Sequence, residues 1–213
     1  MMVDAAKAVG VGLLIWSALE SVSGISKGKY VHVDHFDGKA DITAYAHASG
    51  VPLIIAQNGW YATNHMLLDG FVPRKDPEAD GAYVLALPMG EDTIVPIIDA
   101  ARDYGLFVRE AIESPAFGPG SEVLASGEDI SLRDMCAQLS QKSRYKRISD
   151  EEFMAATKQP HRIALEFLEN AKFCEEFGYF GDKDTKPSRE HLSRTPRTWA
   201  DFVRATDWSS ILV

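Results

Sequence analysis

Short apolar runs and longer segments of helical periodicity alternate along this chain of 213 residues. Short runs of β-branched and large apolar residues are typical of buried strands, whereas apolar positions three and four apart are typical of helices. The pattern predicts strands at residues 11–19, 51–55, 83–87, 121–125 and 144–148. It predicts helices at residues 3–8, 36–49, 96–111, 132–139, 162–177 and 199–205, and one more that begins after Ser149. This alternation of strands and helices predicts the α/β fold class.

The stretch from residue 30 to residue 61 organises the rest of the predicted fold. Gly50 follows the alanine-rich helix at residues 36–49, in the position where a residue with positive φ commonly ends a helix. A polar and aromatic turn at residues 57–64 then follows the strand at residues 51–55. Strand, helix, strand and polar loop is the order found in parallel α/β sheets, which bind ligands at the carboxyl ends of their strands. We therefore expect a binding site around this turn.

Start and stop signals support several of the helices. Pro96 suits the first turn of the helix at 96–111, and Ser131 can cap the next one. Ser149 with Glu152 three residues later has the pattern of a capping box, and Gly178 ends the last long helix. Polar residues, glycines and prolines predict loops at residues 17–29, 67–80 and 181–197.

Composition and charge restrict the possible functions. The hydrophobic content of 46% and charged content of 25% are those of an ordinary soluble protein. The net charge of −9 argues against direct binding of nucleic acid by phosphate neutralisation. Cys136 and Cys174 are too few for a disulfide framework or a zinc site, and the apolar run at residues 9–16 is too short to span a membrane. We expect a cytoplasmic or nuclear protein without a membrane partner.

The order and spacing of several segments resemble the NmrA-like family of atypical short-chain dehydrogenases/reductases. The resemblance is strongest over residues 3–156. The segments that carry it are Asp4-Ala5-Ala6-Lys7-Ala8, Trp16-Ser17, Gly28-Lys29-Tyr30-Val31-His32-Val33-Asp34-His35-Phe36-Asp37-Gly38-Lys39, Ala48-Ser49-Gly50-Val51-Pro52, Gly59-Trp60-Tyr61, Val95-Pro96-Ile97-Ile98-Asp99 and Asp103-Tyr104-Gly105-Leu106-Phe107-Val108.

The resemblance implies a Rossmann-type domain that binds NADP(H) or NAD(H). It implies that residues 1–213 form the C-terminal portion of such a domain, a partial Rossmann-like parallel sheet with a small mixed α/β subdomain on the substrate side. The glycine-rich phosphate loop of the family precedes the point at which this sequence starts. Gly10-Val11-Gly12 and Gly118-Pro119-Gly120 do not substitute for that loop, because neither follows a strand cleanly, and we expect both to be turns.

His35 and Lys39 are the first candidate site residues. They are four residues apart on a predicted helix and therefore share a face. The resemblance places them at the Tyr-x-x-x-Lys pair of the dehydrogenases, with histidine in place of tyrosine. It implies that Lys39 binds the nicotinamide ribose, and an imidazole, which titrates near ~6.5, could carry a proton in place of the phenol. The alternative is an exposed His-Lys pair on a solvated helix face.

The remaining candidates follow the two central strands. The resemblance places Ser17 near a catalytic hydroxyl, although a serine that simply ends a strand is the alternative. It places the turn after the second strand near the nicotinamide, and Tyr61 is a weak catalytic candidate there. The alternative is a loop whose aromatic residues cover the core. The expected cofactor-binding set is Ser17, Lys39, Asn58, Gly59, Trp60 and Tyr61. We predict no metal site, because His32 and His35 lack further ligands at suitable spacing.

Three functions remain open at this point. The first is a redox-linked regulator that binds NAD(P)(H), has little or no catalytic activity and contacts a regulatory protein partner. The second is an NADPH-dependent reductase of a small carbonyl or alkene substrate. The third is a truncated chain that acts only as an interaction scaffold.

Overall fold

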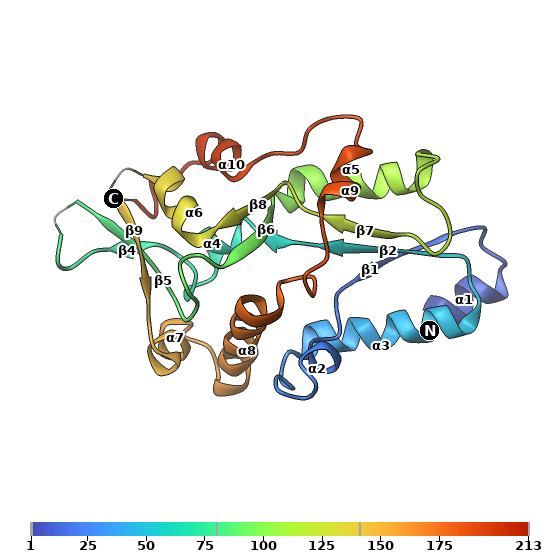
Figure 1. Cartoon of the computed structure of the whole chain (residues 1–213), viewed down its shortest axis with the longest axis horizontal. Helices are drawn as coiled ribbons and strands as arrows, with labels where there is room; N and C mark the ends of the chain where they lie inside the picture. The colour runs from blue at the N-terminus through green and yellow to red at the C-terminus, as the bar shows by residue number, and fades with distance from the viewer. Residues whose placement is uncertain (1, 80, 141, 213) are drawn as a thin grey trace.

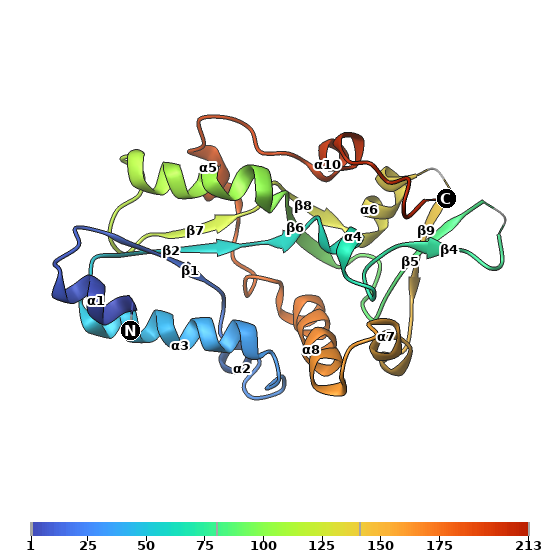
Figure 2. The ribbon, with the colours of Figure 1, turned by 180° about the vertical axis from the view of Figure 1, so that it is seen from behind.

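A three-stranded parallel sheet forms one part of the molecule in the computed structural model, which describes residues 2–79, 81–140 and 142–212. Its strands are β1 (Leu14–Ala18), β2 (Leu53–Asn58) and β7 (Glu122–Ala125), in the order β1-β2-β7. Helix α3 (Asp34–Ser49) covers one face and α5 (Ala100–Glu113) covers the other (Figures 1 and 2). Helix α1 (Met2–Ala8) packs beside α3.

The two faces of this sheet are buried by alternate residues of its strands. Ile54 in β2 packs against Phe107 from α5, and both side chains are fully buried. The preceding residue, Leu53, packs on the opposite face against Ala46 from α3. Because helices cover both faces, the strands consist mainly of apolar residues, as expected for a parallel sheet.

The second part contains two smaller mixed sheets. One has the order β3-β6-β8 and the other β4-β5-β9. Their strands are β3 (Trp60–Tyr61), β4 (Arg74–Lys75), β5 (Tyr83–Leu87), β6 (Ile94–Ile98), β8 (Glu128–Ser131) and β9 (Ser143–Arg147). The helices of this part are α4 (Asn64–Leu67), α6 (Leu132–Leu139), α7 (Asp150–Ala156), α8 (His161–Phe177) and α10 (Trp199–Ala205). The short helices α2 (Val22–Ile25) and α9 (Lys186–Glu190) lie against the first part.

Gly59 is the residue at which the chain passes from the parallel sheet to the second part. It lies between β2 and β3, and its N–H donates to the carbonyl of Ala125 at 2.9 Å. A Cβ atom at this position would lie 2.1 Å from the carbonyl oxygen of Pro96. Only a glycine therefore allows the two sheets to meet so closely.

Several elements have the predicted bounds. Strand β5, helix α6 and helix α10 begin and end where the sequence pattern places them. Ser149 and Glu152 form a capping box, and Gly50 ends α3 with a φ of +74°. The Gly-x-Gly segments at residues 10–12 and 118–120 both contain turns. The α/β prediction is confirmed.

The predicted helix at residues 96–111 was wrong in its first part. Residues Ile94–Ile98 form strand β6, and α5 begins only at Ala100. The N-cap is Asp99, whose side chain accepts a hydrogen bond from the N–H of Arg102. The β-branched apolar run of β6 therefore outweighs the preference of Pro96 for a first helical turn.

Four predicted turns or loops contain regular structure. The predicted turn at residues 57–64 includes the end of β2 and all of β3, because Trp60 and Tyr61 pair with β6. The predicted loop at residues 17–29 contains α2, the one at 67–80 contains β4, and the one at 181–197 contains α9. Asp80 lies outside the described residues. These short elements have too few residues for a recognisable period.

A pair of glycine variants tests the close contact at Gly59. We expect Gly59→Ala to lower the free energy of unfolding by more than about 3 kcal/mol or to prevent folding, because the added methyl group meets backbone. Gly38→Ala is the control: it lies in α3 with open space around its Cα, and it should raise the stability by about 0.5–1 kcal/mol. Urea unfolding measures both, and equal effects of the two variants would contradict this assignment.

Candidate functional site

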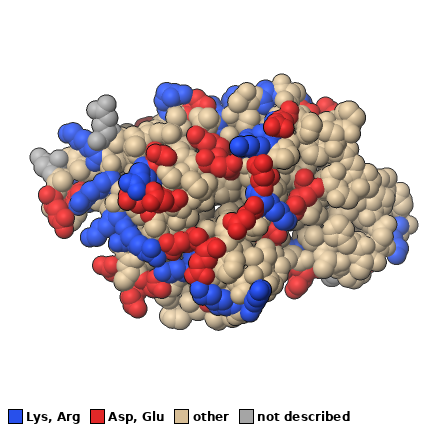
Figure 3. All heavy atoms as spheres, viewed as in Figure 1, with Lys and Arg blue, Asp and Glu red and all other residues tan. Residues whose placement is uncertain are grey.

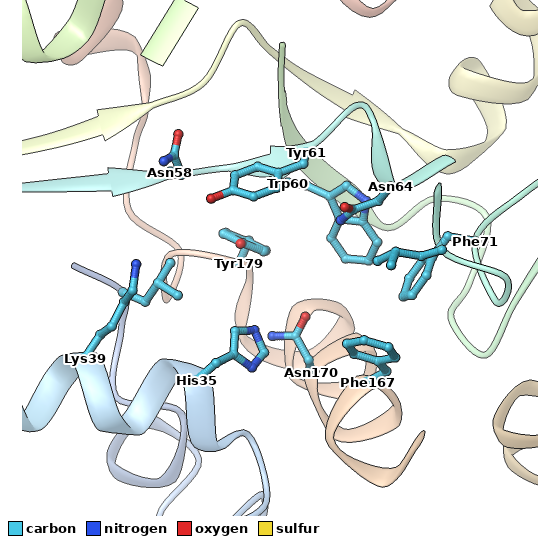
Figure 4. Close-up of a pocket in the computed structure, with 12 residues that line it drawn as sticks. His35, Lys39, Asn58, Trp60, Tyr61, Asn64, Phe71, Phe167, Asn170 and Tyr179 are labelled. Atoms are coloured by element: carbon cyan, nitrogen blue, oxygen red, sulfur yellow. The ribbon is translucent and has the colours of Figure 1, made fainter. Parts of the chain in front are cut away.

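A cavity of about 210 Å³ lies at the carboxyl ends of β1 and β2, between α3 and α8 (Figure 4). Its lining residues come from α3, from the ends of β1 and β2, from β3 and the segment after it, from α8 and from the residues just after α8. They are Leu19, His35, Lys39, Asn58, Trp60, Tyr61, Asn64, Leu68, Phe71, Phe167, Asn170 and Tyr179. The cavity therefore occupies the edge at which parallel α/β sheets bind ligands.

Aromatic rings form much of the wall. Trp60 contacts Phe71 edge to face at 5.4 Å between ring centroids and lies 6.2 Å from Tyr179. Tyr61 is 39% exposed, and Figure 4 shows its ring lying along the cavity. Burial raises the pKa of Tyr179 well above its usual range, so this phenol is neutral. A chamber of this kind suits a flat ring.

Three buried polar atoms from lining residues have no hydrogen-bond partner among the described residues. They are Oδ1 of Asn58, Nε1 of Trp60 and Nδ2 of Asn170. A buried donor or acceptor without a partner costs free energy. Figure 4 shows the Asn170 amide directed between His35 and Tyr179. These residues offer both donors and an acceptor to a ligand.

Among the described residues that line this cavity, Lys39 is the only lysine. Its Nζ donates to the Ser17 hydroxyl at 3.2 Å. Burial lowers the pKa of Lys39. In Figure 4 the ammonium points from α3 towards the end of β2. Ser17 is not among the lining residues and lies behind Lys39 as its partner.

His35 is held by a carboxylate from α8. The Glu166 carboxylate accepts a short hydrogen bond from Nδ1 of His35, and also one from the backbone N–H of His35 at 2.9 Å. A carboxylate partner fixes the tautomer that carries its proton on Nδ1. The opposite edge of the ring, with Nε2, faces the cavity (Figure 4). His35 can therefore accept or donate a proton there through Nε2.

A second carboxylate from α8 holds the segment that leads into α3. Glu169 accepts hydrogen bonds from the N–H groups of Val31 and His32, at 2.7 and 2.8 Å, and from Nδ1 of His32 at 2.6 Å. The N-cap residue that follows, Val33, makes no side-chain cap. His32 and His35 are thus both hydrogen-bonded to glutamates. The described residues contain no group of three or more His, Cys, Asp or Glu side chains placed to hold a metal ion.

Acidic and basic side chains are interspersed on the face of the molecule that contains α7 and α8. Figure 3 shows neither sign forming a continuous patch there. Many of these side chains form ion pairs, such as Lys29 with Glu176 and Arg162 with Asp34, both at 2.6 Å. This face therefore gives no support to a polyanionic partner.

The structure brings most of the predicted site residues together. His35, Lys39, Asn58, Trp60 and Tyr61 line one cavity. Gly59 is not among the lining residues, and its N–H donates to the carbonyl of Ala125. Sequence reasoning missed the contribution of α8 and the residues that follow it, which supply Phe167, Asn170 and Tyr179 to the lining and Glu166 as the partner of His35. It also named none of the lining residues Leu19, Leu68 and Phe71 as site residues. The amphipathic pattern of α8 predicts a helix, but no local signal shows which element its polar face contacts.

A buried histidine packs against the ring of Trp60. His65 stacks against Trp60 at 6.4 Å and is 1% exposed. Its Nδ1 donates to the carbonyl of Phe71 at 3.0 Å, and its Nε2 has no partner among the described residues. Burial lowers the pKa of His65 to about 4, so the ring is neutral at physiological pH.

Comparisons with known proteins agree with the fold. A sequence model described as the NmrA-like family matches residues 1–203. The structure of NmrA, a negative transcriptional regulator, in complex with NADP has a TM-score of 0.71 and 20% identity, over 95% of this chain and 67% of that chain. Its complex with NAD has a TM-score of 0.72 and 20% identity, over 97% of this chain and 71% of that chain. The NADPH-dependent quinone oxidoreductase from Escherichia coli, complexed with NADPH, has a TM-score of 0.71 and 20% identity over 95% of this chain and 68% of its own. Among the described residues, no helix is long and apolar enough to cross a membrane.

The burial of His65 predicts a specific loss of stability in acid. Because its pKa falls from the ordinary 6.5 to about 4 on folding, the unfolded chain binds the proton more tightly. The neutral ring therefore contributes stability that is present above pH 6.5 and is lost as the pH falls towards 4, by about 3 kcal/mol in total. Urea unfolding at a series of pH values should show a smaller acid loss in His65→Gln. The exposed His161→Gln is the control, and an unchanged pH dependence in His65→Gln would contradict this view.

Proposed function

The chain belongs to the NmrA-like family, and from this premise we propose that it binds NAD(H) or NADP(H) with the nicotinamide end in the cavity between α3, β2 and α8. The observation that carries the proposal is the half-buried Lys39 ammonium, which lines an aromatic chamber at the carboxyl ends of two parallel strands. The complexes of NmrA and of the quinone oxidoreductase support it, because those proteins share this fold and bind such dinucleotides.

The lining residues suit a nicotinamide ribose. Lys39 would donate to the ribose hydroxyls, and the amides of Asn58 and Asn170 would exchange hydrogen bonds with a carboxamide. Their unpartnered buried atoms give a physical reason for a polar ligand at this place. Trp60 and Tyr179 would pack against the flat ring.

Redox-linked regulation is the first candidate role for this binding. The family resemblance places His35 where the dehydrogenases have tyrosine, and its Nδ1 is hydrogen-bonded to Glu166. The similarity to NmrA, a negative transcriptional regulator, favours the same role. The cavity lies between α3, in the first part of the fold, and α8, in the second. A ligand there would contact both parts and could change the surface that the protein presents to a partner.

A reductase is the second candidate, and one observation favours it. A carboxylate that orients a histidine through Nδ1, with Nε2 facing a cavity, is the arrangement of a general acid–base pair. A reduced nicotinamide supplies hydride when bound. His35 would hold a proton at Nε2, Glu166 would fix the tautomer, and the aromatic wall would exclude water from a small carbonyl or alkene.

Calorimetric titration tests the binding itself. We expect saturable, micromolar binding of NADPH or NADH by the purified chain. Lys39→Met keeps the aliphatic stem but loses the ammonium, and it should weaken binding about tenfold or more. Lys7→Met in the exposed surface of α1 is the matched control. Absence of binding by a folded protein would overturn the proposal and leave an interaction role.

Oxidation of NADPH in the presence of small carbonyl and alkene compounds separates the two roles. A regulator should show no turnover beyond the background. A reductase should show turnover that Glu166→Gln lowers by about 10- to 100-fold and that His35→Phe abolishes. Glu113→Gln, an exposed carboxylate on α5, is the control. Turnover that is insensitive to His35→Phe would exclude the general acid–base role of this residue.

A further inference from the structure

A second cavity, of about 260 Å³, lies on the outer face of the small sheet formed by β4, β5 and β9. This sheet stands at one end of the molecule, near α7 (Figure 1). Alternate residues of a strand point to opposite faces of its sheet. In β5, Leu85 and Leu87 are buried in the core, whereas Val84 and Ala86 line the cavity. The sheet therefore separates this cavity from the core.

The strand register places cationic side chains around the apolar floor of this cavity. Val84 pairs with Arg74 of β4 and with Arg144 of β9. Ala86, a small residue, pairs with Lys146. Paired residues lie on the same face of a sheet, and all five line the cavity. The short side chain of Ala86 leaves room beside the stem of Lys146, which can pack against the apolar part of a ligand.

The acidic side chains of the lining all have partners. Asp76 and Glu78 both pair with Arg144, at 2.5 and 3.2 Å. Glu152 accepts a hydrogen bond from the N–H of Ser149 at 2.8 Å, as part of the capping box of α7. These carboxylates are therefore not waiting for a cation.

Two cationic side chains of the lining have no carboxylate partner among the described residues. Arg74 donates to the carbonyls of Asp69 and Ala156, at 2.8 and 3.0 Å. The exposed Lys146 ammonium makes no hydrogen bond or ion pair with the described part of the chain. The lining has four cationic side chains against three acidic ones, so it is positive in a protein whose net charge is −9. Its charge is complementary to an anion.

We propose that this cavity is a binding site for a small organic anion, a carboxylic acid with an apolar body, and that Lys146 holds its carboxylate. An ammonium and a carboxylate form a charge-assisted hydrogen bond. The apolar body would cover Val84 and Ala86 and remove their surface from water. The cavity encloses a small molecule and not an extended chain, which agrees with the mixed charge of the surrounding surface.

This site is separate from the candidate dinucleotide site, although one segment contributes to both. Gly70 lines the second cavity, and its neighbour Phe71 lines the first. Neither His35 nor Lys39 lines the second cavity. Binding of an organic anion there should therefore not depend on the residues proposed to contact the dinucleotide.

Titration of the full chain with benzoate, followed in amide correlation NMR spectra, tests the proposal. We expect saturable shifts for the amides of residues 70–78 and 144–148, which contribute to the lining. Benzamide has the ring without the charge, and inorganic phosphate has the charge without the ring. Each should bind at least about tenfold more weakly than benzoate. Equal affinity of benzoate and either compound would contradict the assignment of an organic anion.

A lysine variant identifies the anchoring group. Lys146→Met keeps the apolar stem but loses the ammonium, and it should weaken benzoate binding about tenfold. Lys39→Met in the first cavity and Lys7→Met on the exposed surface of α1 are the controls and should leave it unchanged. Shifts confined to residues of the first cavity, or an affinity that Lys146→Met does not change, would overturn the proposal. Failure of the chain to bind NADPH would leave this result intact, so the two proposals can fail separately.

Discussion

The N-terminus of α3 depends on two carboxylates that belong to another helix. A helix begins with N–H groups that have no partner within the helix, and α3 lacks a capping side chain of its own. Glu166 of α8 accepts a hydrogen bond from the N–H of His35 in the first turn of α3, and Glu169 of α8 accepts those from Val31 and His32 in the segment that leads into the helix. These contacts join the start of α3 to α8, and the candidate site is the space between the two helices. A shift of α8 would move the partner of His35 and one wall of the cavity together.

The close contact at Gly59 positions the side of the site that β2 and β3 form. The chain leaves the parallel sheet at Asn58 and enters the mixed sheet at Trp60. The polar end of β2 and the first aromatic residue of the wall are therefore only two positions apart. The absence of a side chain at Gly59 lets the backbone of Pro96 approach. The first part of the molecule thus supplies the ammonium, and the second part supplies the aromatic surface.

The elements that could be predicted from the sequence are those that depend on local patterns. Strand β5, helix α6 and the capping box at Ser149 follow from period and end signals within a few residues. The helix predicted from Pro96 was wrong because proline at this position suits either a first helical turn or a strand. The pairing of β6 with β3 and β8 selects the strand. For the site, the family resemblance indicates residues within 35–61 that line the cavity, and also Ser17, which contacts Lys39 but is not among the lining residues. Glu166 escaped prediction because its role arises from a contact across 131 positions, with His35.

The central claim is that the nicotinamide end of a dinucleotide occupies the cavity between α3, β2 and α8. Saturation-transfer difference NMR with NADP and the intact chain tests it most directly, because it identifies the ligand protons in contact with protein. The account predicts strong saturation of the nicotinamide ring protons, reduced in Lys39→Met. Saturation confined to the adenine protons, or a nicotinamide signal unaffected by Lys39→Met, would contradict it.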